Sequence, residues 1–537
     1  MAAGLALTAL AALTYPSATL AQPVAAAAAD RQTVVDGLQT QYEVALIRER
    51  KMADDRETQL IGALEARLKA ARAQADAAKG SASAANAQLA AARADYAKLA
   101  GQITQRDPAT AADVTAHQAQ AQSAVAQSSP EKLAALQRFS DGDRVGAWPQ
   151  LLALTTAEMG ASGVTVAKQA ADERELADLR DIMRAHGEAT TADVLALYDK
   201  AGDLDPSHFK TQINRARLAR DLGDLSRARG AAEQALKVAA TDEERATALK
   251  YIGEQASDQH DYAAAGPDFD QALEMFRRMA ASDANAVTQN RVAGVLQDKG
   301  DLQLLQGDFK GARASYSEAL ALRQTLATAN PNDGGLQDEL TSVMQRLGDL
   351  YEKTGDLAGA KGEFEQGLAI RQRLSAADPT NTDLQYYVSA FLRRLGDIAL
   401  ERRDLADARA KYEACLAIRQ RLAAADSSSA QLQNAVALDL EDLAGVAFDQ
   451  NDAKTAQADY EASLAIRQRL AAVYPTNAAL QQLILRAMTR LARVTGSDAT
   501  WRDVAVQYLR IKAAGELTAG DEKVRDALRA HHLEVGL

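Results

Sequence analysis

Apolar and small residues recur at helical spacing through most of the chain, and one short pattern is written four times. The copies begin at Tyr316, Phe364, Tyr412 and Tyr460, and in each the aromatic residue is followed at the same offsets by leucine and Arg-Gln. The step between copies is 48 residues each time. Self-similarity at a fixed period of this size is typical of a solenoid, in which each repeat packs on its neighbours.

Each copy predicts two helices joined by a tight turn. In the second copy, Leu347, Gly348 and Tyr351 lie at helical spacing before Gly355 and Asp356, a helix-ending glycine followed by a residue that caps the next helix. Small residues at such positions let two helices approach, and large ones fill the space between them. The positions expected to pack in this way are Leu347, Gly348, Tyr351, Ala360, Phe364, Leu368, Tyr412, Leu416, Tyr460 and Leu464.

The pattern continues more weakly on both sides of these copies. The leucine step is 37 from Leu236 to Leu273 and 47 from Leu273 to Leu320, and Tyr460 projects to Tyr508. We therefore expect a repeat array over residues 207–516, followed by a capping helix within 517–537, because the last repeat of a solenoid would otherwise expose its apolar face. Residues 131–206 are predicted to be helical, with degenerate repeats as one interpretation.

The N-terminal part has a different pattern. In residues 30–104, apolar residues between Leu89 and Ile103 recur at steps of three and four, which is typical of a coiled-coil seam. The alternative is a solvated helix that never dimerises. Residues 105–130 are polar and rich in alanine, glutamine and serine, and we interpret them as a linker.

Residues 1–21 resemble a secretory signal peptide, with an apolar run from Leu5 to Leu13 and a small-residue site ending at Ala21. The basic segment that normally precedes the apolar run is missing, since the first basic residue is Arg31. We expect export to the bacterial periplasm if residues 1–21 act as a signal peptide, and a cytoplasmic location if they do not. No later stretch reaches the ~20 apolar residues of a spanning helix, so we expect no membrane span in the mature chain.

Composition and charge narrow the possible partners. The chain has 47% hydrophobic residues but only 4% aromatic ones, a balance that favours helix. Its formal net charge of −12 argues against nucleic acid, because phosphate binding requires a basic surface.

No motif for chemistry is found in the sequence. It lacks a phosphate-binding loop ending in Gly-Lys-Ser/Thr, a Gly-x-Ser-x-Gly elbow and a His-Glu-x-x-His pair. Cys415 is the single cysteine and is interpreted as a small buried residue, and the adjacent His531 and His532 would point about 100° apart on a helix, which disfavours a shared metal ion. We predict no catalytic residues, no metal, no cofactor and no enzymatic activity.

The most conspicuous charged feature is a repeated pair of arginines in each second helix. We expect these arginines to complement the helix dipole and to pair with acids on the adjacent repeat. The alternative is a basic ladder for an anionic ligand. The pairs are Arg371 with Arg373, Arg419 with Arg421, and Arg467 with Arg469.

These repeats resemble the tetratricopeptide repeat (TPR) family, whose pattern Leu347, Gly348, Tyr351, Ala360 and Phe364 fit. The family's usual period is about 34 residues, and the surplus of about 14 corresponds to about two extra turns per helix. Long-helix variants, such as those in kinesin light chain, are similar in kind. The resemblance implies an all-α protein: a right-handed α-solenoid of TPR-like hairpins, here preceded by the coiled-coil segment.

The resemblance also implies that first helices line a concave groove that binds a protein or peptide. The Lys/Asn/Arg carboxylate clamp of chaperone-binding members is absent, so a chaperone tail is disfavoured. We expect a non-catalytic adaptor or scaffold of the bacterial cell envelope, and the coiled coil offers a surface for homo-oligomers. One alternative is a structural spacer whose groove binds no ligand. The other is a regulatory partner of a separately encoded enzyme. The implied groove residues are Gln345, Asp349, Glu352, Arg393, Asp397, Glu401, Glu441 and Arg493.

Overall fold

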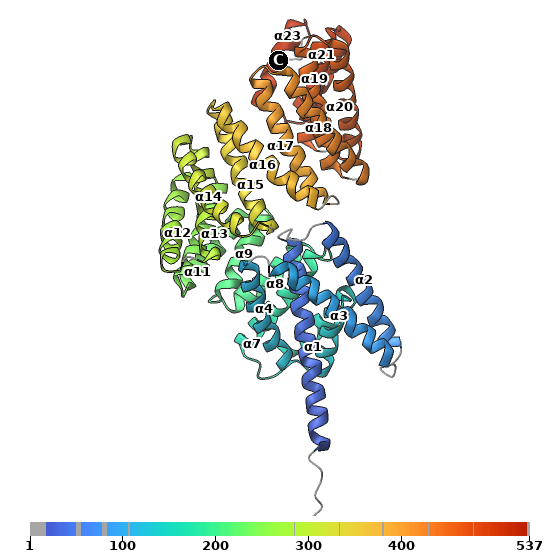
Figure 1. Cartoon of the computed structure of the whole chain (residues 1–537), viewed down its shortest axis with the longest axis vertical. Helices are drawn as coiled ribbons and strands as arrows, with labels where there is room; N and C mark the ends of the chain where they lie inside the picture. The colour runs from blue at the N-terminus through green and yellow to red at the C-terminus, as the bar shows by residue number, and fades with distance from the viewer. Residues whose placement is uncertain are drawn as a thin grey trace, which may run out of the picture. The chain divides into compact units, whose positions relative to one another are not determined.

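The computed structural model is helical throughout the part of the chain that it describes (Figure 1). Contacts divide the chain into two units, Met1–Ala53 with Glu57–Val287, and Asp54–Arg56 with Thr288–Leu537. The structure describes residues 18–49, 55–77, 83–105, 108–283, 285–331, 333–377, 381–427, 429–475 and 477–533.

Among the described residues, the first unit consists of α1 to α12 without the first residues of α2, together with the start of α13. Its N-terminal part is a bundle around α1, which contacts α3, α4, α5 and α7. The helices are α1 (Ala18–Glu49), α2 (Asp55–Ala77), α3 (Ser83–Thr104), α4 (Pro108–Gln127), α5 (Pro130–Ser140), α6 (Arg144–Met159), α7 (Val166–Ala185), α8 (Thr191–Leu204), α9 (Phe209–Asp221), α10 (Leu225–Val238), α11 (Asp242–Asp258) and α12 (Tyr262–Ser282).

The stripe predicted as a coiled-coil seam is buried inside this unit. Leu89, Tyr96 and Ile103 of α3 form one apolar cluster with residues of α2 and with Val44 and Ile47 of α1. Tyr96 also donates a hydrogen bond to Glu65 of α2 at 2.7 Å. The heptad spacing is therefore used for packing within one chain, and this stripe is not left open for a second copy.

The prediction of a linker is wrong for residues 108–127, which form α4. Ala121 and Val125 of α4 are buried in a cluster with Val34 and Leu38 of α1. Alanine has the highest helix propensity and its small side chain lets two helices approach closely, so a composition that reads as linker also suits a packed helix.

The remaining helices of the first unit form hairpins. Consecutive helices pack as α5 with α6, α7 with α8, α9 with α10, and α11 with α12. Residues 131–206 thus hold α5 to α8. Side-chain caps define several helix starts: Thr190 forms a capping box with Asp193, and Asp224 accepts a hydrogen bond from the backbone N–H of Arg227.

The second unit continues the hairpins with longer helices. Consecutive helices pack against one another from α14 to α22. The bounds are α13 (Ala286–Leu305), α14 (Phe309–Ala329), α15 (Gly334–Lys353), α16 (Leu357–Ala377), α17 (Thr382–Glu401), α18 (Leu405–Ala425), α19 (Ala430–Asp449), α20 (Ala453–Val473), α21 (Ala478–Thr495), α22 (Asp498–Ala513), the 3-10 helix η1 (Ala519–Asp521) and α23 (Glu522–Ala530).

The turn inside each hairpin is built in the same way in every strong copy. Gly307 and Gly355 have φ of 77° and 82°, in the left-handed region where glycine carries no penalty. The equivalent Arg403 and Asn451 adopt φ of 62°. An aspartate follows at each turn and accepts a hydrogen bond from the third backbone N–H beyond it, as Asp404 does from Asp407.

The glycine of the repeat is required by an aromatic ring. A Cβ placed on Gly348 would lie 2.4 Å from Cε1 of Phe364, and one on Gly396 would lie 2.6 Å from the same atom of Tyr412. Both rings are almost fully buried. The first and second helices of a repeat therefore meet at a contact between an aromatic ring and the glycine backbone that a methyl group would disrupt.

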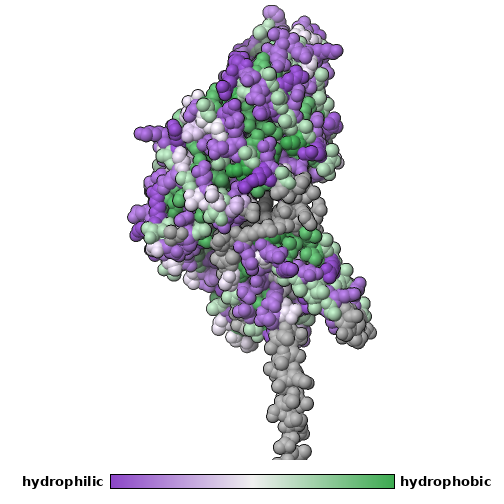
Figure 2. Space-filling model, in the orientation of Figure 1, coloured by the Kyte–Doolittle hydropathy of each residue, from purple (hydrophilic) through white to green (hydrophobic). Residues whose placement is uncertain are grey.

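The C-terminal end of the second unit has its own apolar cluster. Val524 and Leu528 of α23 pack with Trp501 and Tyr508 of α22. Polar and charged residues cover much of the visible surface, with apolar residues showing between them (Figure 2). Within the described residues, no helix combines the length and the apolar character that crossing a membrane requires.

Candidate functional site

The first helices of the second unit, α13, α15, α17, α19 and α21, lie next to one another and form what we call the first-helix face. Ion pairs join each first helix to the next one. These pairs are Arg346 with Asp301 at 3.2 Å, Arg394 with Asp349 at 2.8 Å, Arg393 with Asp442 at 2.7 Å, and Arg490 with Glu441 at 2.8 Å.

Aspartates of the first-helix face also accept hydrogen bonds from tyrosines of the second helices. Tyr316 donates a hydrogen bond to Asp301 at 2.5 Å, and Tyr412 donates one to Asp397 at 2.7 Å. The copy between them has Phe364 in place of tyrosine, and its Asp349 pairs with Arg394. Burial raises the pKa of both Asp301 and Asp349 above the ordinary value, although the neighbouring arginines oppose this. Asp301 and Asp349 thus each join the first helix of one repeat to the first helix of the next.

Most of the groove residues implied by the TPR resemblance lie on this face, where the charged ones form ion pairs mainly with side chains outside the implied set. Arg394 lies 2.8 Å from Asp349, 3.7 Å from Glu352 and 3.8 Å from Asp397. Arg393 lies 3.8 Å from Asp397 in addition to its closer contact with the next repeat. These charges contribute to the stacking of repeats, which spacing alone did not reveal.

Glu441 is not a surface residue, contrary to its expected role as a ligand contact. Its side chain is 4% exposed and accepts hydrogen bonds from Ser463, Arg467 and Arg490. Glu401 and Arg493, by contrast, are exposed.

A column of buried arginines runs through the second helices. Arg323, Arg371, Arg419 and Arg467 follow one another at the repeat step and are 6%, 3%, 5% and 1% exposed. Arg371 pairs with Asp338 of its own repeat and stacks on Tyr387, while Arg419 pairs with Asp439 of the next repeat. Pairing with an acid of the adjacent repeat, as the sequence predicts, therefore holds for Arg419, whereas Arg371 and Arg467 use acids of their own repeats.

The second arginine of each pair lies nearer to solvent. Arg373 and Arg421 each donate a hydrogen bond to a glutamine of a first helix, Gln337 and Gln385, and Arg469 is exposed. The two members of each pair thus differ, with one inside the repeat stack and one at its surface.

Cys415 belongs to a buried polar cluster. Its Sγ lies 3.4 Å from Asp439, which pairs with Arg419 at 2.7 Å, and Arg419 also donates to Ser389 at 3.0 Å. Burial raises the pKa of Asp439 to about 6 against the opposing effect of Arg419, and burial also raises the pKa of the Cys415 thiol. The thiol is therefore protonated at neutral pH, which suits a packing role.

A cavity of about 330 Å³ opens on the first-helix face over α15. Two of the buried arginines, Arg323 and Arg371, line it, and the Nε of each is buried without a hydrogen-bond partner among the described residues. Thr341 and Ser342 are the small side chains that α15 contributes to its lining. The lining residues are Gln297, Arg323, Asp338, Glu339, Thr341, Ser342, Gln345, Arg371, Tyr387 and Phe391.

The cavity offers recognition chemistry. Its guanidinium, carboxylate, amide and hydroxyl groups, with two aromatic rings, can hydrogen-bond and pack against a polar peptide. Gln345 is the implied groove residue that lines it. The two arginines were missed as groove residues, although their recurrence at the repeat step, beside apolar neighbours, was a signal of burial. No cluster of histidine, cysteine or acidic residues within the described ranges could hold a metal ion.

Comparison with known proteins finds similarity among solved structures. No family model matches the chain, and no curated protein matches it. BtubC from P. vanneervenii is 25% identical over 47% of this chain and 91% of that chain, with a TM-score of 0.37. A TPR protein from Parabacteroides merdae is 17% identical over 58% of this chain and 100% of that chain, with a TM-score of 0.37.

A signal-transduction ATPase of the STAND class with a TPR sensor, from Pyrococcus horikoshii, is 11% identical over 76% of this chain and 56% of that chain, with a TM-score of 0.47. With TM-scores below 0.5, none of these structures bears on what this chain binds. Its own repeats, with the contact between Gly348 and Phe364 at their centre, make it a TPR-like all-α solenoid.

Proposed function

We propose that the chain is a non-catalytic scaffold that binds a protein partner through the first-helix face. The observation that carries this proposal is the cavity over α15, where Arg323, Arg371, Tyr387 and the amide of Gln345 surround one open space. Its volume of about 330 Å³ suits one or two side chains of an extended peptide. A polar lining with aromatic rings favours a peptide that carries polar side chains.

The location of this binding is part of the proposal. The apolar leader favours export, which would place the scaffold in the bacterial cell envelope. Residues 1–17 of that leader lie outside the described residues. Fusion of residues 1–30 to alkaline phosphatase tests this directly, because the enzyme becomes active only after export.

Testing the groove requires a substitution that leaves the ion pairs intact. Reversing Arg393 and Asp397 would break the contacts with Asp442 and Tyr412, so lost binding would be confounded with lost stability. Ser342 avoids this problem, since it lines the cavity and is half-buried. Ser342→Tyr fills the space with a ring.

The matched control is Gln366→Tyr, which adds the same ring to an exposed position of α16. We expect the wild type and Gln366→Tyr to capture the same partner in a crosslinking pull-down and Ser342→Tyr to lose it, with equal thermal unfolding in all three. Equal capture by Ser342→Tyr would place partner binding elsewhere.

A spacer is the second candidate function, and the ion pairs across repeats favour it. Each of the junctions between α13 and α21 is joined by an arginine and a carboxylate, which would resist bending of the array. A spacer predicts sensitivity to deleting one 48-residue unit and no effect of Ser342→Tyr in cells.

A further inference from the structure

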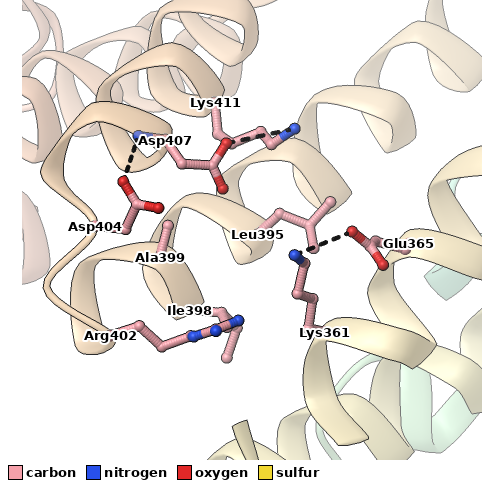
Figure 3. A pocket seen from close by; sticks show the side chains of 9 residues that line it. All are labelled: Lys361, Glu365, Leu395, Ile398, Ala399, Arg402, Asp404, Asp407 and Lys411. Atoms are coloured by element: carbon pink, nitrogen blue, oxygen red, sulfur yellow. Dashed lines mark hydrogen bonds and ion pairs between the residues drawn. The ribbon is translucent and has the colours of Figure 1, made fainter. Parts of the chain in front are cut away.

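A second cavity, of about 320 Å³, lies where α16, α17 and the start of α18 meet. It shares no lining residue with the cavity over α15. Figure 3 shows Arg402 and Lys361 on one side of it and Lys411 across from them. The lining residues are Lys361, Glu365, Leu395, Ile398, Ala399, Arg402, Asp404, Asp407 and Lys411.

Two equivalent junctions, between α18 and α19 and between α10 and α11, are closed by a hydrogen bond between an arginine and a glutamine. Arg409 of α18 donates to Gln450, which follows α19, at 3.3 Å. Arg229 of α10 donates to Gln259, which follows α11, also at 3.3 Å. In both cases a second helix is joined to the end of the next first helix.

The junction between α16 and α17 differs from these two. Lys361 stands at the position of Arg409, 48 residues earlier, and Arg402 stands at the position of Gln450. Two cations therefore occupy the places where the junction between α18 and α19 has a donor and a neutral acceptor. Like charges cannot form the bridge, and the junction holds a cavity in its place.

The acids around this cavity form ion pairs with the two lysines along their own helices and none with Arg402 among the described residues. Glu365 lies 3.5 Å from Lys361 and Asp407 lies 3.8 Å from Lys411, each an i,i+4 pair along one helix and longer than a hydrogen bond of good geometry. Asp404 is occupied as the cap of α18. No ion pair or hydrogen bond of the Arg402 side chain is found within the described residues.

The floor of the cavity is apolar. Leu395, Ile398 and Ala399 of α17 form it, with exposed fractions of 4% or less. Cations at the rim above an aliphatic floor match a ligand with an anionic end and an apolar stem. The volume is at the lower end of the range of small-molecule sites.

We propose that this cavity binds a small organic carboxylate, whose carboxylate bridges Arg402 and Lys361 and whose carbon chain rests on Leu395 and Ile398. The bound anion takes the place of the Arg–Gln hydrogen bond found between α18 and α19 and connects the repeats on either side. Arg402 suits the role because its planar guanidinium binds a carboxylate through two parallel hydrogen bonds. This site is separate from the first-helix face and goes beyond partner binding there.

The test is calorimetric titration of the full chain with glutarate at fixed ionic strength. The structure suggests its own knock-out: Lys361→Arg with Arg402→Gln recreates the pair found at Arg409 and Gln450. We expect saturable binding of glutarate to the wild type and at least tenfold weaker binding to this double variant. Its thermal unfolding temperature should equal or exceed that of the wild type, because the new bridge closes the junction.

Three controls sharpen the result. Arg409→Gln removes a cation from the next junction and should leave glutarate binding unchanged, and the single variant Arg402→Gln should weaken it. Glutaramide, the neutral isostere, should not bind. Glutarate binding that fails to saturate, or that the double variant retains, would overturn the proposal, and binding of inorganic phosphate without glutarate would refute the carboxylate class.

Discussion

The buried pair of Arg467 and Glu441 gives the sharpest prediction about how the repeats are held together. Arg467 is 1% exposed and donates to Glu441 and to the carbonyl oxygen of Leu483 at 3.1 Å. Glu441 is 4% exposed and also accepts from Ser463 at 3.1 Å. Replacing Glu441 by leucine would leave a guanidinium buried without its counter-ion.

The magnitude follows from that burial. Breaking a buried pair by removing one partner costs about 3–5 kcal/mol, whereas the pair of Glu441 with the half-exposed Arg490 adds at most about 1 kcal/mol. Arg467→Met should cost about 1–3 kcal/mol, because Glu441 keeps two of its partners. Replacing both partners by apolar residues is often neutral, so the double variant should be more stable than Glu441→Leu alone.

Fluorescence-detected urea unfolding can measure this cycle. The chain has two tryptophans, Trp148 in the first unit and Trp501 in α22 of the second. A Trp148→Phe background leaves Trp501, which is 3% exposed, to report on the second unit. We expect a coupling free energy of about 3 kcal/mol between Glu441→Leu and Arg467→Met. Additivity within about 0.5 kcal/mol would refute the reasoning.

Three further predictions follow from single contacts. Gly348→Ala should destabilise the second unit by about 1–3 kcal/mol, because the added Cβ overpacks on Phe364. Gly362→Ala is the control, since its added Cβ meets nothing within 4 Å, and equal urea midpoints for the two variants would contradict the prediction. Because burial raises the pKa of Asp439 to about 6 in the folded state, the folded chain binds this proton more tightly than the unfolded chain does. The stabilisation that Asp439 contributes is therefore greatest below its unfolded pKa and is lost as pH rises through 6. Asp439→Asn should reduce the fall in unfolding free energy between pH 4 and 7 by up to about 3 kcal/mol, and an unchanged pH profile of unfolding would reject this prediction. Asp141, 1% exposed and paired with arginines of α2 and α3, should hold these helices, so Asp141→Asn should speed amide exchange in α2 and α3 and leave α17 unaffected.

Periodicity predicted the part of the fold that depends on packing between neighbours in sequence. The repeat step placed the hairpins, and the aspartates at the turns cap the second helices as Asp308 and Asp404 show. The small residue at Gly348 was predicted to allow close approach, and the ring of Phe364 explains why it must be glycine.

The N-terminal part shows where such reasoning fails. An apolar stripe such as Leu89 to Ile103 shows that one face of a helix is buried, but it does not show which element covers that face. Here α1 and α2 of the same chain cover it. Residues 108–127 lack large apolar residues, so α4 was missed, although Ala121 and Val125 suffice to pack on α1.

The candidate site was predicted as a face and not as a set of contacts. Family spacing put Asp349 and Arg393 on the first helices, but their partners, Arg394 and Asp442, come from positions that the pattern does not mark. Pairing across repeats depends on side-chain length and on which carboxylate lies within reach. The cavity over α15 arises from local choices such as Ser342 and could be found only in three dimensions.

Site-specific photocrosslinking tests the scaffold proposal most directly. A diazirine analogue of methionine at position 345 is about as long as the glutamine that it replaces, so it lines the cavity over α15 without filling it, and the same group at position 366 replaces an exposed glutamine of α16. In cells that produce the full chain, the proposal predicts one defined protein adduct from position 345 and none from position 366. Equal adducts from both positions, or none from position 345, would contradict binding through the first-helix face.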